Sequence, residues 1–336
     1  WSTEPTHQGG WRVRVRKGPK WLLLLVSLWA IVLLITPWTL AEAATLYVTN
    51  GHSGTISVID TASRKVVKTI PNVGARPNRV AFTRDGQRAY VVDDEALVLI
   101  VIDAVRQEVI GTIRAGRRPY NLAFTPDGKS CYVVDWWDSE VLIFDAELKR
   151  LEATIKVGTW PAHTIFSRNG RIAYVSNETT GDVSVVDTEA QKVLATIPSG
   201  GYAMGLSLSP DEKHLYVGNG EPRTVSKVDT KTHQIVATIP LMDVTHDVAV
   251  TPDGKHLYVS LRNLNKIAVI STAEDRLVVT IPQGRKPDLI VMDPVENVAY
   301  VTNRHSGTVS VIDLRTHTVT GKIAVGANPH GMALQP

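Results

Sequence analysis

The sequence predicts an all-β protein, a seven-bladed β-propeller with four antiparallel strands in each blade. Three observations predict it. A unit of 42 or 43 residues recurs seven times along the 336 residues, and each unit contains four short apolar segments separated by turn residues. The two ends of the repeat region also complement each other, so that they can close a ring.

The dipeptide Tyr-Val marks the repeat. One interval between successive copies is 43 residues and the other five are 42 residues. The nearly identical stretches "NGHSGTISVID" (50–60) and "NRHSGTVSVID" (303–313) therefore lie six units apart. The seven tyrosines are Tyr47, Tyr90, Tyr132, Tyr174, Tyr216, Tyr258 and Tyr300.

The third unit illustrates the four strands in order. We expect strands at 121–125, 131–135, 140–145 and 152–157, which are rich in Val, Ile, Thr and Tyr. Pro126-Asp127-Gly128 separates the first two and suits a tight hairpin, because Pro presets φ and Gly accepts a positive φ. No helical periodicity competes with this pattern.

The expected strands are apolar on both faces, as in "LVLIVID" (97–103). Sheets covered on both sides have this composition, and each propeller blade is covered by its two neighbours. The first strands of five units alternate large and small residues, as in Leu122-Ala123-Phe124. This alternation suits the narrow inner edge of a wedge-shaped blade.

The ends of the repeat region predict how the ring closes. Residues 45–50 have the pattern of a second strand, and residues 332–336 have that of a first strand. We expect one blade to combine three strands from the start with one strand from the end, which leaves no free sheet edge. This closure places His52 and His305 in adjacent blades, so we expect them to be neighbours around the ring.

Residues 1–43 have the layout of a signal peptide. Basic residues from Arg12 to Lys20 precede the apolar run 21–35, and Ala41-Glu42-Ala43 offers a small-x-small cleavage site. We therefore expect a Sec-type signal peptide, a propeller over 44–336, and a periplasmic or extracellular protein. The alternative is an uncleaved segment that anchors the protein in the inner membrane.

Charge and cysteine content exclude some function classes. Of 36 basic and 33 acidic residues, five basic and two acidic precede residue 44, which leaves 31 of each sign. A neutral propeller argues against binding to nucleic acid, which needs a basic face. The single cysteine, Cys131, occupies a position that is small or apolar in the other units, so we expect it to be buried. We expect a monomer without disulfides.

Several phrases resemble the YVTN family of β-propeller repeat proteins, over about residues 44–336. The resemblance implies the fold but not a function, because the repeated residues build the blades. The phrases are "YVTN" (47–50 and 300–303), "SGTISVID" (53–60), "GARPNRVAFTRDG" (74–86) and "TPDGKHLYVS" (251–260).

Histidines suggest one candidate site. His163, His246 and His330 stand just before or within the first strands of the fourth, sixth and first blades, at the expected mouth of the central channel. Three imidazoles that converge there could bind a metal or a cofactor iron. His246 and His330 directly follow the Pro position, whereas His163 falls one residue later, which turns a strand side chain to the other side. The alternative is loop histidines bonded to backbone or water.

Aromatic residues suggest a second candidate site. All three tryptophans after residue 43 fall in loops where the third blade meets the fourth. Aromatic side chains beside arginine are typical of a surface that binds a ligand or a partner protein, and loop packing is the alternative. The predicted patch contains Trp136, Trp137, Trp160, Tyr120, Arg117, Arg118 and His163, with Tyr202 one blade further on.

Acidic residues occupy the corresponding loops of the second to fifth blades. Their spacing matches no dedicated calcium loop, so we expect solvated carboxylates. They are Asp93, Asp94, Glu95, Asp135, Asp138, Glu178 and Glu221.

Two functions follow from these observations. The first is an exported, non-catalytic binding or scaffold protein that holds a partner protein or a small ligand on one face of the ring, without a cofactor. It agrees with the absence of catalytic motifs such as Gly-x-Ser-x-Gly or His-Glu-x-x-His. The second is a cofactor-binding propeller, haem d1-related or metal-dependent, or a lactone-hydrolase-like propeller, because propellers similar to the YVTN family include such proteins. Seven blades instead of eight argue against the haem alternative, and regular blades without long acidic insertions argue against the hydrolase.

Overall fold

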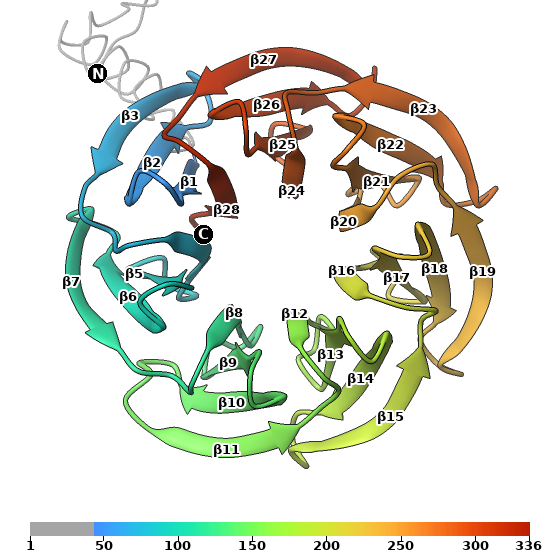
Figure 1. Ribbon diagram of the computed structural model, residues 1–336, viewed down its shortest axis with the longest axis horizontal. Coiled ribbons are helices and arrows are strands. Elements are labelled where there is room, and N and C mark those ends of the chain that lie inside the picture. The colour runs from blue at the N-terminus through green and yellow to red at the C-terminus, as the bar shows by residue number, and fades with distance from the viewer. Residues whose placement is uncertain (1–43) are drawn as a thin grey trace, which may run out of the picture. The chain divides into compact units, whose positions relative to one another are not determined.

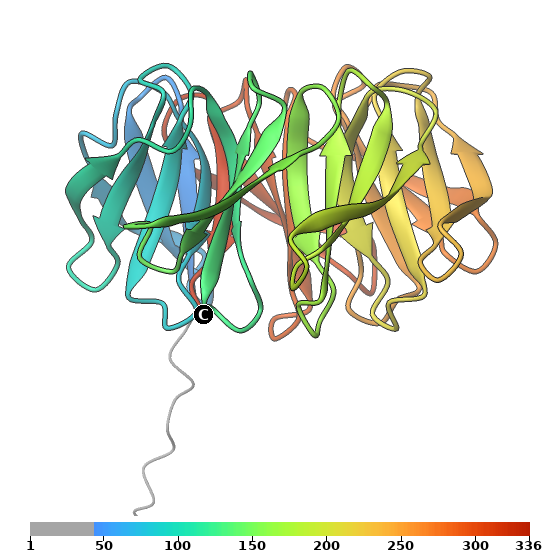
Figure 2. The ribbon, with the colours of Figure 1, turned by 90° about the horizontal axis from the view of Figure 1, so that it is seen from below.

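The computed structural model describes residues 44–336, which form seven four-stranded antiparallel sheets arranged in a ring (Figure 1). The predicted fold class is confirmed. Figure 2 shows the ring from the side, with loops at its two opposite faces. Within the described residues no helix is long and apolar enough to cross a membrane. The predicted signal peptide, residues 1–43, lies outside the described residues.

Each blade has an innermost, a second, a third and an outer strand. The innermost strands are β4 (Pro77–Phe82), β8 (Pro119–Phe124), β12 (Pro161–Phe166), β16 (Ala203–Leu208), β20 (Thr245–Val250), β24 (Pro287–Asp293) and β28 (Pro329–Leu334). The second strands are β1 (Thr45–Asn50), β5 (Arg88–Asp93), β9 (Ser130–Asp135), β13 (Ile172–Asn177), β17 (His214–Asn219), β21 (His256–Leu261) and β25 (Val298–Asn303).

The other two strands complete each sheet. The third strands are β2 (Thr55–Asp60), β6 (Val98–Asp103), β10 (Glu140–Asp145), β14 (Asp182–Asp187), β18 (Thr224–Asp229), β22 (Lys266–Ser271) and β26 (Thr308–Asp313). The outer strands are β3 (Lys65–Ile70), β7 (Glu108–Ile113), β11 (Leu151–Lys156), β15 (Lys192–Pro198), β19 (Gln234–Pro240), β23 (Arg276–Pro282) and β27 (Thr318–Ala324). We number the blades from 1 (β28 with β1–β3) to 7 (β24–β27).

Blade 1 closes the ring as the sequence predicts. β28 pairs antiparallel with β1, so that Leu46 lies opposite Leu334 and Val48 lies opposite Met332. The remaining strands of this sheet, β2 and β3, follow β1 along the chain. The first and last strands therefore share one sheet, and the inner edge of blade 1 is made by the last strand.

The repeated tyrosines belong to the packing between blades. Tyr47 is fully buried, and its ring meets that of Phe82 in the next blade edge to face, with centroids 4.8 Å apart. Its hydroxyl donates a hydrogen bond to the Ala104 carbonyl. Cys131 is fully buried in a similar cluster, as expected, and burial raises the pKa of its thiol. The repeat motif is thus scaffold.

In blades 2 and 3, the aspartate that ends the second strand positions the loops of one face. The Asp135 carboxylate accepts hydrogen bonds from the backbone N–H groups of Arg118 and Trp137, in the two loops on either side of it. Asp93 does the same in blade 2. Both carboxylates are fully buried, so the expectation that Asp93 and Asp135 are solvated is wrong. Loop amides replace water around them, which fixes the backbone of this face.

Candidate functional site at the channel mouth

Two positions in each blade form the channel mouth, at the face where the innermost strands begin. The first mouth position directly follows the Pro that opens the innermost strand, or its counterpart. The second directly follows the second strand. The first positions are Asn78, Tyr120, Ala162, Met204, His246, Asp288 and His330; the second are Gly51, Asp94, Trp136, Glu178, Gly220, Arg262 and Arg304.

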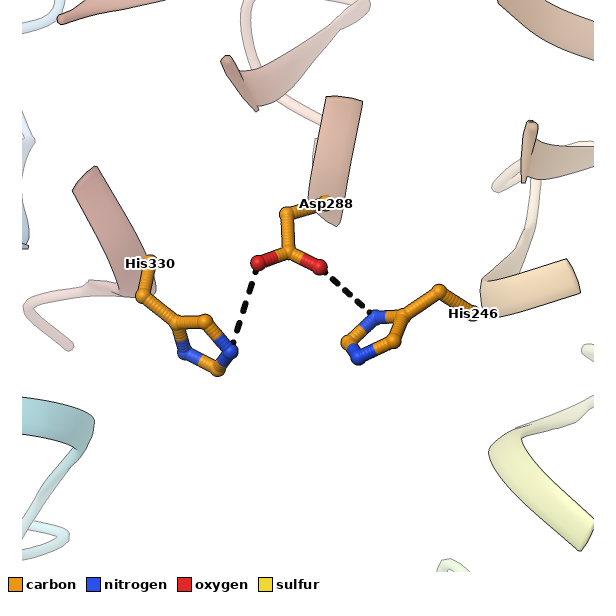
Figure 3. A group of neighbouring side chains, drawn as sticks. All are labelled: His246, Asp288 and His330. Atoms are coloured by element: carbon orange, nitrogen blue, oxygen red, sulfur yellow. Dashed lines mark ion pairs between the residues drawn. The ribbon is translucent and has the colours of Figure 1, made fainter. Parts of the chain in front are cut away.

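An acidic residue lies between two imidazoles at this mouth (Figure 3). Asp288 on β24 is fully buried, and its two carboxylate oxygens face opposite ways. Oδ1 lies 2.9 Å from Nδ1 of His246 on β20, and Oδ2 lies 3.3 Å from Nε2 of His330 on β28. Three consecutive blades thus each contribute one side chain.

Two arginines flank the same carboxylate. Nε of Arg262 lies 3.5 Å from Oδ1 of Asp288, and Nη1 of Arg304 lies 3.4 Å from Oδ2. Both arginines occupy second mouth positions, in blades 6 and 7. We call His246, Asp288, His330, Arg262 and Arg304 the Asp288 cluster.

Charges in this cluster follow from burial and from the arginines. Burial, opposed by the charge of Asp288 and assisted by that of Arg262, lowers the pKa of His246 to about 4. Burial also holds the pKa of His330 well below its usual value. Burial opposes ionisation of Asp288, but His246, His330 and Arg262 together keep its pKa well below 3.8. At neutral pH the cluster therefore combines a carboxylate, two neutral imidazoles and two guanidinium groups.

His163 does not belong to this cluster. Its Nδ1 accepts a hydrogen bond from the backbone N–H of Leu206 on β16, at 3.2 Å, so it joins blade 4 to blade 5. Burial, followed by the charges of Arg79 and His246, lowers its pKa to about 3. The predicted trio of His163, His246 and His330 is not assembled, because the one-residue difference in position sends His163 toward the neighbouring blade. Instead, Asp288 of blade 7 lies between His246 and His330.

The predicted aromatic patch is partly assembled. The ring of Trp136 stacks on Trp160, with centroids 4.2 Å apart, and on Tyr120, with centroids 6.1 Å apart. The guanidinium carbon of Arg118 lies 4.4 Å from the centroid of the Trp136 ring. We call Tyr120, Trp136, Trp160 and Arg118 the aromatic stack. Trp160 keeps 36% of its surface exposed, so one face remains accessible.

Four residues of the predicted patch lie outside the stack: His163, Arg117, Trp137 and Tyr202. Trp137 is 51% exposed beneath the guanidinium of Arg117, and it lines a groove of about 440 Å³ together with Leu97 and Arg118. Tyr202 is 47% exposed, one blade beyond the stack. The side chains of Trp137 and Tyr202 are surface features, whereas the stack is a packed element of the mouth.

The aromatic stack and the Asp288 cluster face the same mouth. Blades 3 and 4, which carry the stack, lie across the ring from blade 7, which carries Asp288 (Figure 1). Burial raises the pKa of the Tyr120 hydroxyl; Arg79 opposes this rise, whereas Glu178 and Asp288 add to it. Tyr120 is therefore close enough to feel the charges of the cluster. Below them, Arg79 and His163 line a cavity of about 360 Å³ in the channel.

His52 and His305 lie in loops of adjacent blades, as expected. His52 Nε2 is 2.8 Å from Nδ2 of Asn328, and Oδ1 of Asn328 accepts a hydrogen bond from Nε of Arg304. His305 is exposed, and its backbone N–H bonds to the carbonyl of Arg285. Among the described residues no hydrogen bond or ion pair joins the two imidazoles. Adjacency of blades did not bring them into contact.

A family model described as the YNCE-like β-propeller matches residues 15–335. The chain belongs to the YNCE-like β-propeller family. No curated protein matches the chain.

Solved structures similar to this YNCE-like propeller include three of different kinds. Hydrazine synthase of Kuenenia stuttgartiensis has a TM-score of 0.73 and 22% identity, covering 81% of this chain and 93% of its own. A functionally unknown protein from Desulfotomaculum acetoxidans has a TM-score of 0.74 and 16% identity, covering 86% and 98%. Dihydro-haem d1 dehydrogenase NirN in complex with DHE has a TM-score of 0.68 and 13% identity, covering 88% and 76%. At these identities the likeness concerns the fold alone.

Sequence reasoning missed several residues of the YNCE-like mouth. Asp288 directly follows Pro287, in the same register as His330, and an alignment of all seven units at the first mouth position would have found it. Arg262 and Arg304 would have emerged from the second mouth position in the same way. Glu178 was expected to be solvated, but burial raises the pKa of its carboxyl, so that expectation is wrong.

Proposed function

We propose that this YNCE-like propeller is an exported, non-catalytic binding protein that holds a planar, anionic aromatic ligand at its channel mouth. The observation that carries the proposal is that the aromatic stack faces the side of the mouth where two arginines, Arg262 and Arg304, share the single carboxylate of Asp288. The absence of catalytic sequence motifs supports the non-catalytic part of the proposal. Export rests on the signal-peptide layout of residues 1–43.

The charge balance of the mouth favours an anion. Asp288 is shared between Arg262 and Arg304, so these two guanidinium groups leave a net positive charge beside neutral imidazoles. The buried Nε atoms of Arg79 and Arg118 make no hydrogen bond within the described residues. A buried donor without a partner is costly, and an anionic ligand would satisfy both. A carboxylate, sulfonate or phosphate group fits this chemistry.

The stack favours a flat ring system. Trp160 offers an accessible face, and Trp136 holds Trp160 in place from behind. Arg118 lies against the Trp136 ring, which fixes its guanidinium at the edge of the stack. A ligand that stacks on Trp160 would therefore place its anionic groups near fixed donors. Aromatic and cation–π contacts of this kind contribute about 0.5–2 kcal/mol each.

A direct test uses pyrene-1,3,6,8-tetrasulfonate as a planar anionic probe, titrated calorimetrically into the full chain. We expect one probe to bind per chain, and we expect no comparable binding of citrate, which lacks the rings, or of a pyrenyl ammonium, which has the opposite charge. Trp160→Leu and Arg118→Gln should each weaken binding about tenfold. Trp137→Leu is the matched control, because Trp137 lies outside the stack. The proposal would be contradicted if the cationic probe bound as tightly as the anionic one. It would also be contradicted if Trp137→Leu weakened binding as much as Trp160→Leu does.

A protein partner is the second candidate, and the exposed side chains of Trp137 and Tyr202 favour it. Exposed aromatic residues on a rim are frequent anchors of protein interfaces. If the rim docks a partner, Trp137→Ala should abolish co-purification of that partner without changing probe binding at the mouth. Loss of both activities in one variant would argue that rim and mouth form a single site.

A further inference from the structure

We propose that His246, Asp288 and His330 form a binding site for one divalent transition-metal ion at the channel mouth. This inference goes beyond the proposed function, because it concerns one side of the mouth and does not depend on the aromatic stack. The argument rests on geometry, donor chemistry and the charges around the three residues.

The first step is the geometry of the donor atoms. One ligand atom from each residue can be chosen so that all three lie within 4.8 Å of one another. The imidazole-to-carboxylate distances are 2.9 Å for His246 and 3.3 Å for His330. Neighbouring ligands of an ion with bonds of about 2.1 Å lie about 3.0 Å apart in an octahedron and about 3.4 Å apart in a tetrahedron. These two distances involve different oxygens of Asp288, so they match the spacing around one ion that is bound by both carboxylate oxygens, with one imidazole beside each oxygen.

The second step is that these contacts are not well-formed hydrogen bonds. Within residues 44–336, His246 Nδ1 and both oxygens of Asp288 are buried and have no aligned hydrogen-bond partner, although they lie at contact distance. A carboxylate retained only for structure is expected to accept aligned hydrogen bonds, as Asp135 does from loop amides. The two oxygens of Asp288 therefore each lie close to an imidazole nitrogen without an aligned hydrogen bond from it.

The third step is the donor set. Two imidazoles and one carboxylate are ligands of zinc, iron(II), cobalt and nickel, whereas calcium and magnesium prefer sites made only of oxygen. The three side chains are at most 5% exposed and start from innermost strands held in rigid sheets. Three protein ligands leave coordination positions open toward the axis, where an exogenous ligand can bind.

Arg262 and Arg304 determine what fills those positions. A dication bound to one carboxylate and flanked by two guanidinium groups leaves an excess of positive charge. An anionic ligand on the ion would offset that excess. In the absence of such an anion, the two arginines should weaken metal binding. Removal of one arginine should therefore tighten metal binding, whereas in a purely structural ion-pair network it would only destabilise the protein.

The experiment titrates cobalt(II) into full-chain protein that carries no polyhistidine tag and has been dialysed against a chelator. We expect one ion per chain and visible absorption bands from nitrogen and oxygen ligation. Asp288→Asn and His330→Gln should each weaken binding by at least about 100-fold, more than the effect of a group that only supports a ligand. His305→Gln, which changes an exposed histidine of the same face, is the matched control.

Two further measurements keep the proposal falsifiable if ligand variants unfold. Arg304→Gln should tighten cobalt binding several-fold in a chloride-free, weakly coordinating buffer. Pulsed electron paramagnetic resonance of the copper(II)-loaded wild type should show two coordinated imidazoles. Absence of saturable binding, weaker binding in Arg304→Gln, or fewer than two imidazoles would overturn the proposal. Failure of the pyrene probe to bind would contradict the proposed function and leave the metal site standing.

Discussion

At the scale of single residues, Lys227 shows how one polar side chain is accommodated in the packing between blades. It lies on β18 at a position that is apolar in the other six blades, and it is only 8% exposed. Its Nζ lies 2.9 Å from Oδ1 of Asp275 and donates a hydrogen bond to the carbonyl of Thr272. The pair joins blade 5 to blade 6 in place of a hydrophobic contact.

Asp275→Asn should destabilise the protein by about 3 kcal/mol, because it leaves the Lys227 ammonium buried without its counter-charge. Asparagine also tolerates the left-handed backbone of this position, where φ is 51°. The double variant Lys227→Val, Asp275→Asn should recover most of the loss, since Val is the residue of five other blades here. Urea unfolding measures both. Equal destabilisation of the single and double variants would contradict a buried ion pair.

His163 predicts a pH dependence of stability. Its folded-state pKa of about 3 lies below its ordinary value of 6.5, because of burial. Between pH 3 and pH 6.5, His163 is therefore protonated in the unfolded chain but neutral in the folded chain. The free energy of unfolding consequently falls as the pH drops below 6.5.

Between pH 7 and pH 5 the wild type should lose about 1–2 kcal/mol more free energy of unfolding than His163→Gln. The amide of Gln keeps an acceptor for the Leu206 N–H but does not titrate. Urea unfolding at the two pH values measures the difference, in which the contributions of other groups cancel. Identical pH profiles of the two proteins would show that His163 is not held in its neutral form.

At the scale of elements, the loops of the mouth depend on a close approach between a glycine and a strand end. Gly116 has φ of 87°, and a Cβ there would lie 2.2 Å from Oδ2 of Asp135. Gly200, in the corresponding loop of blade 5, has φ of 111° but open space around it. Both positions have a positive φ, which favours glycine, but only Gly200 has space for a Cβ atom.

Gly116→Ala should therefore destabilise the protein by more than the matched control Gly200→Ala, for which only the backbone cost of about 1–2 kcal/mol applies. Thermal or urea unfolding compares them. Gly116→Ala should also weaken binding of the anionic probe, because Arg118 follows two residues later in the displaced loop. A smaller loss in Gly116→Ala than in Gly200→Ala would contradict the role assigned to Asp135.

Element boundaries could be predicted well because their causes are local. Turn residues such as Pro126-Asp127-Gly128 and the apolar character of the strands suffice to place four strands in the third unit. The innermost strands were harder, since a bulge interrupts their pairing near the start, as between Pro161 and His163. Strand alternation alone does not give the directions of side chains beside such a bulge. The residues beside these bulges include the residues of the channel mouth, so their side-chain directions could not be predicted from the sequence.

At the scale of the whole molecule, the closure of the ring holds together residues that are nearly 290 positions apart. Met332 on β28 is 7% exposed and packs in one cluster with Leu46 and Val48 of β1. Its contacts are therefore made only when the last strand pairs with the first.

Met332→Ala should lower the free energy of unfolding by about 2–4 kcal/mol, because it leaves a cavity in the closing blade. Met242→Ala is the control, since Met242 is 63% exposed and should cost little. Differential scanning calorimetry with urea unfolding measures both. A loss as small as that of the control would mean that the closing strand contributes little to the stability of the ring.

The sequence by itself determined the seven units, their four strands, the closing blade and the buried state of Cys131, because these depend on patterns within one unit or on the order of strands. Tertiary structure decided which side chains meet at the mouth. His246, Asp288 and His330 are 42 residues apart in succession, and their contact depends on the curvature of the ring and on side-chain direction beside the opening proline. Ring curvature and side-chain direction both follow from the packing of neighbouring blades. The sequence of a single unit does not contain that packing.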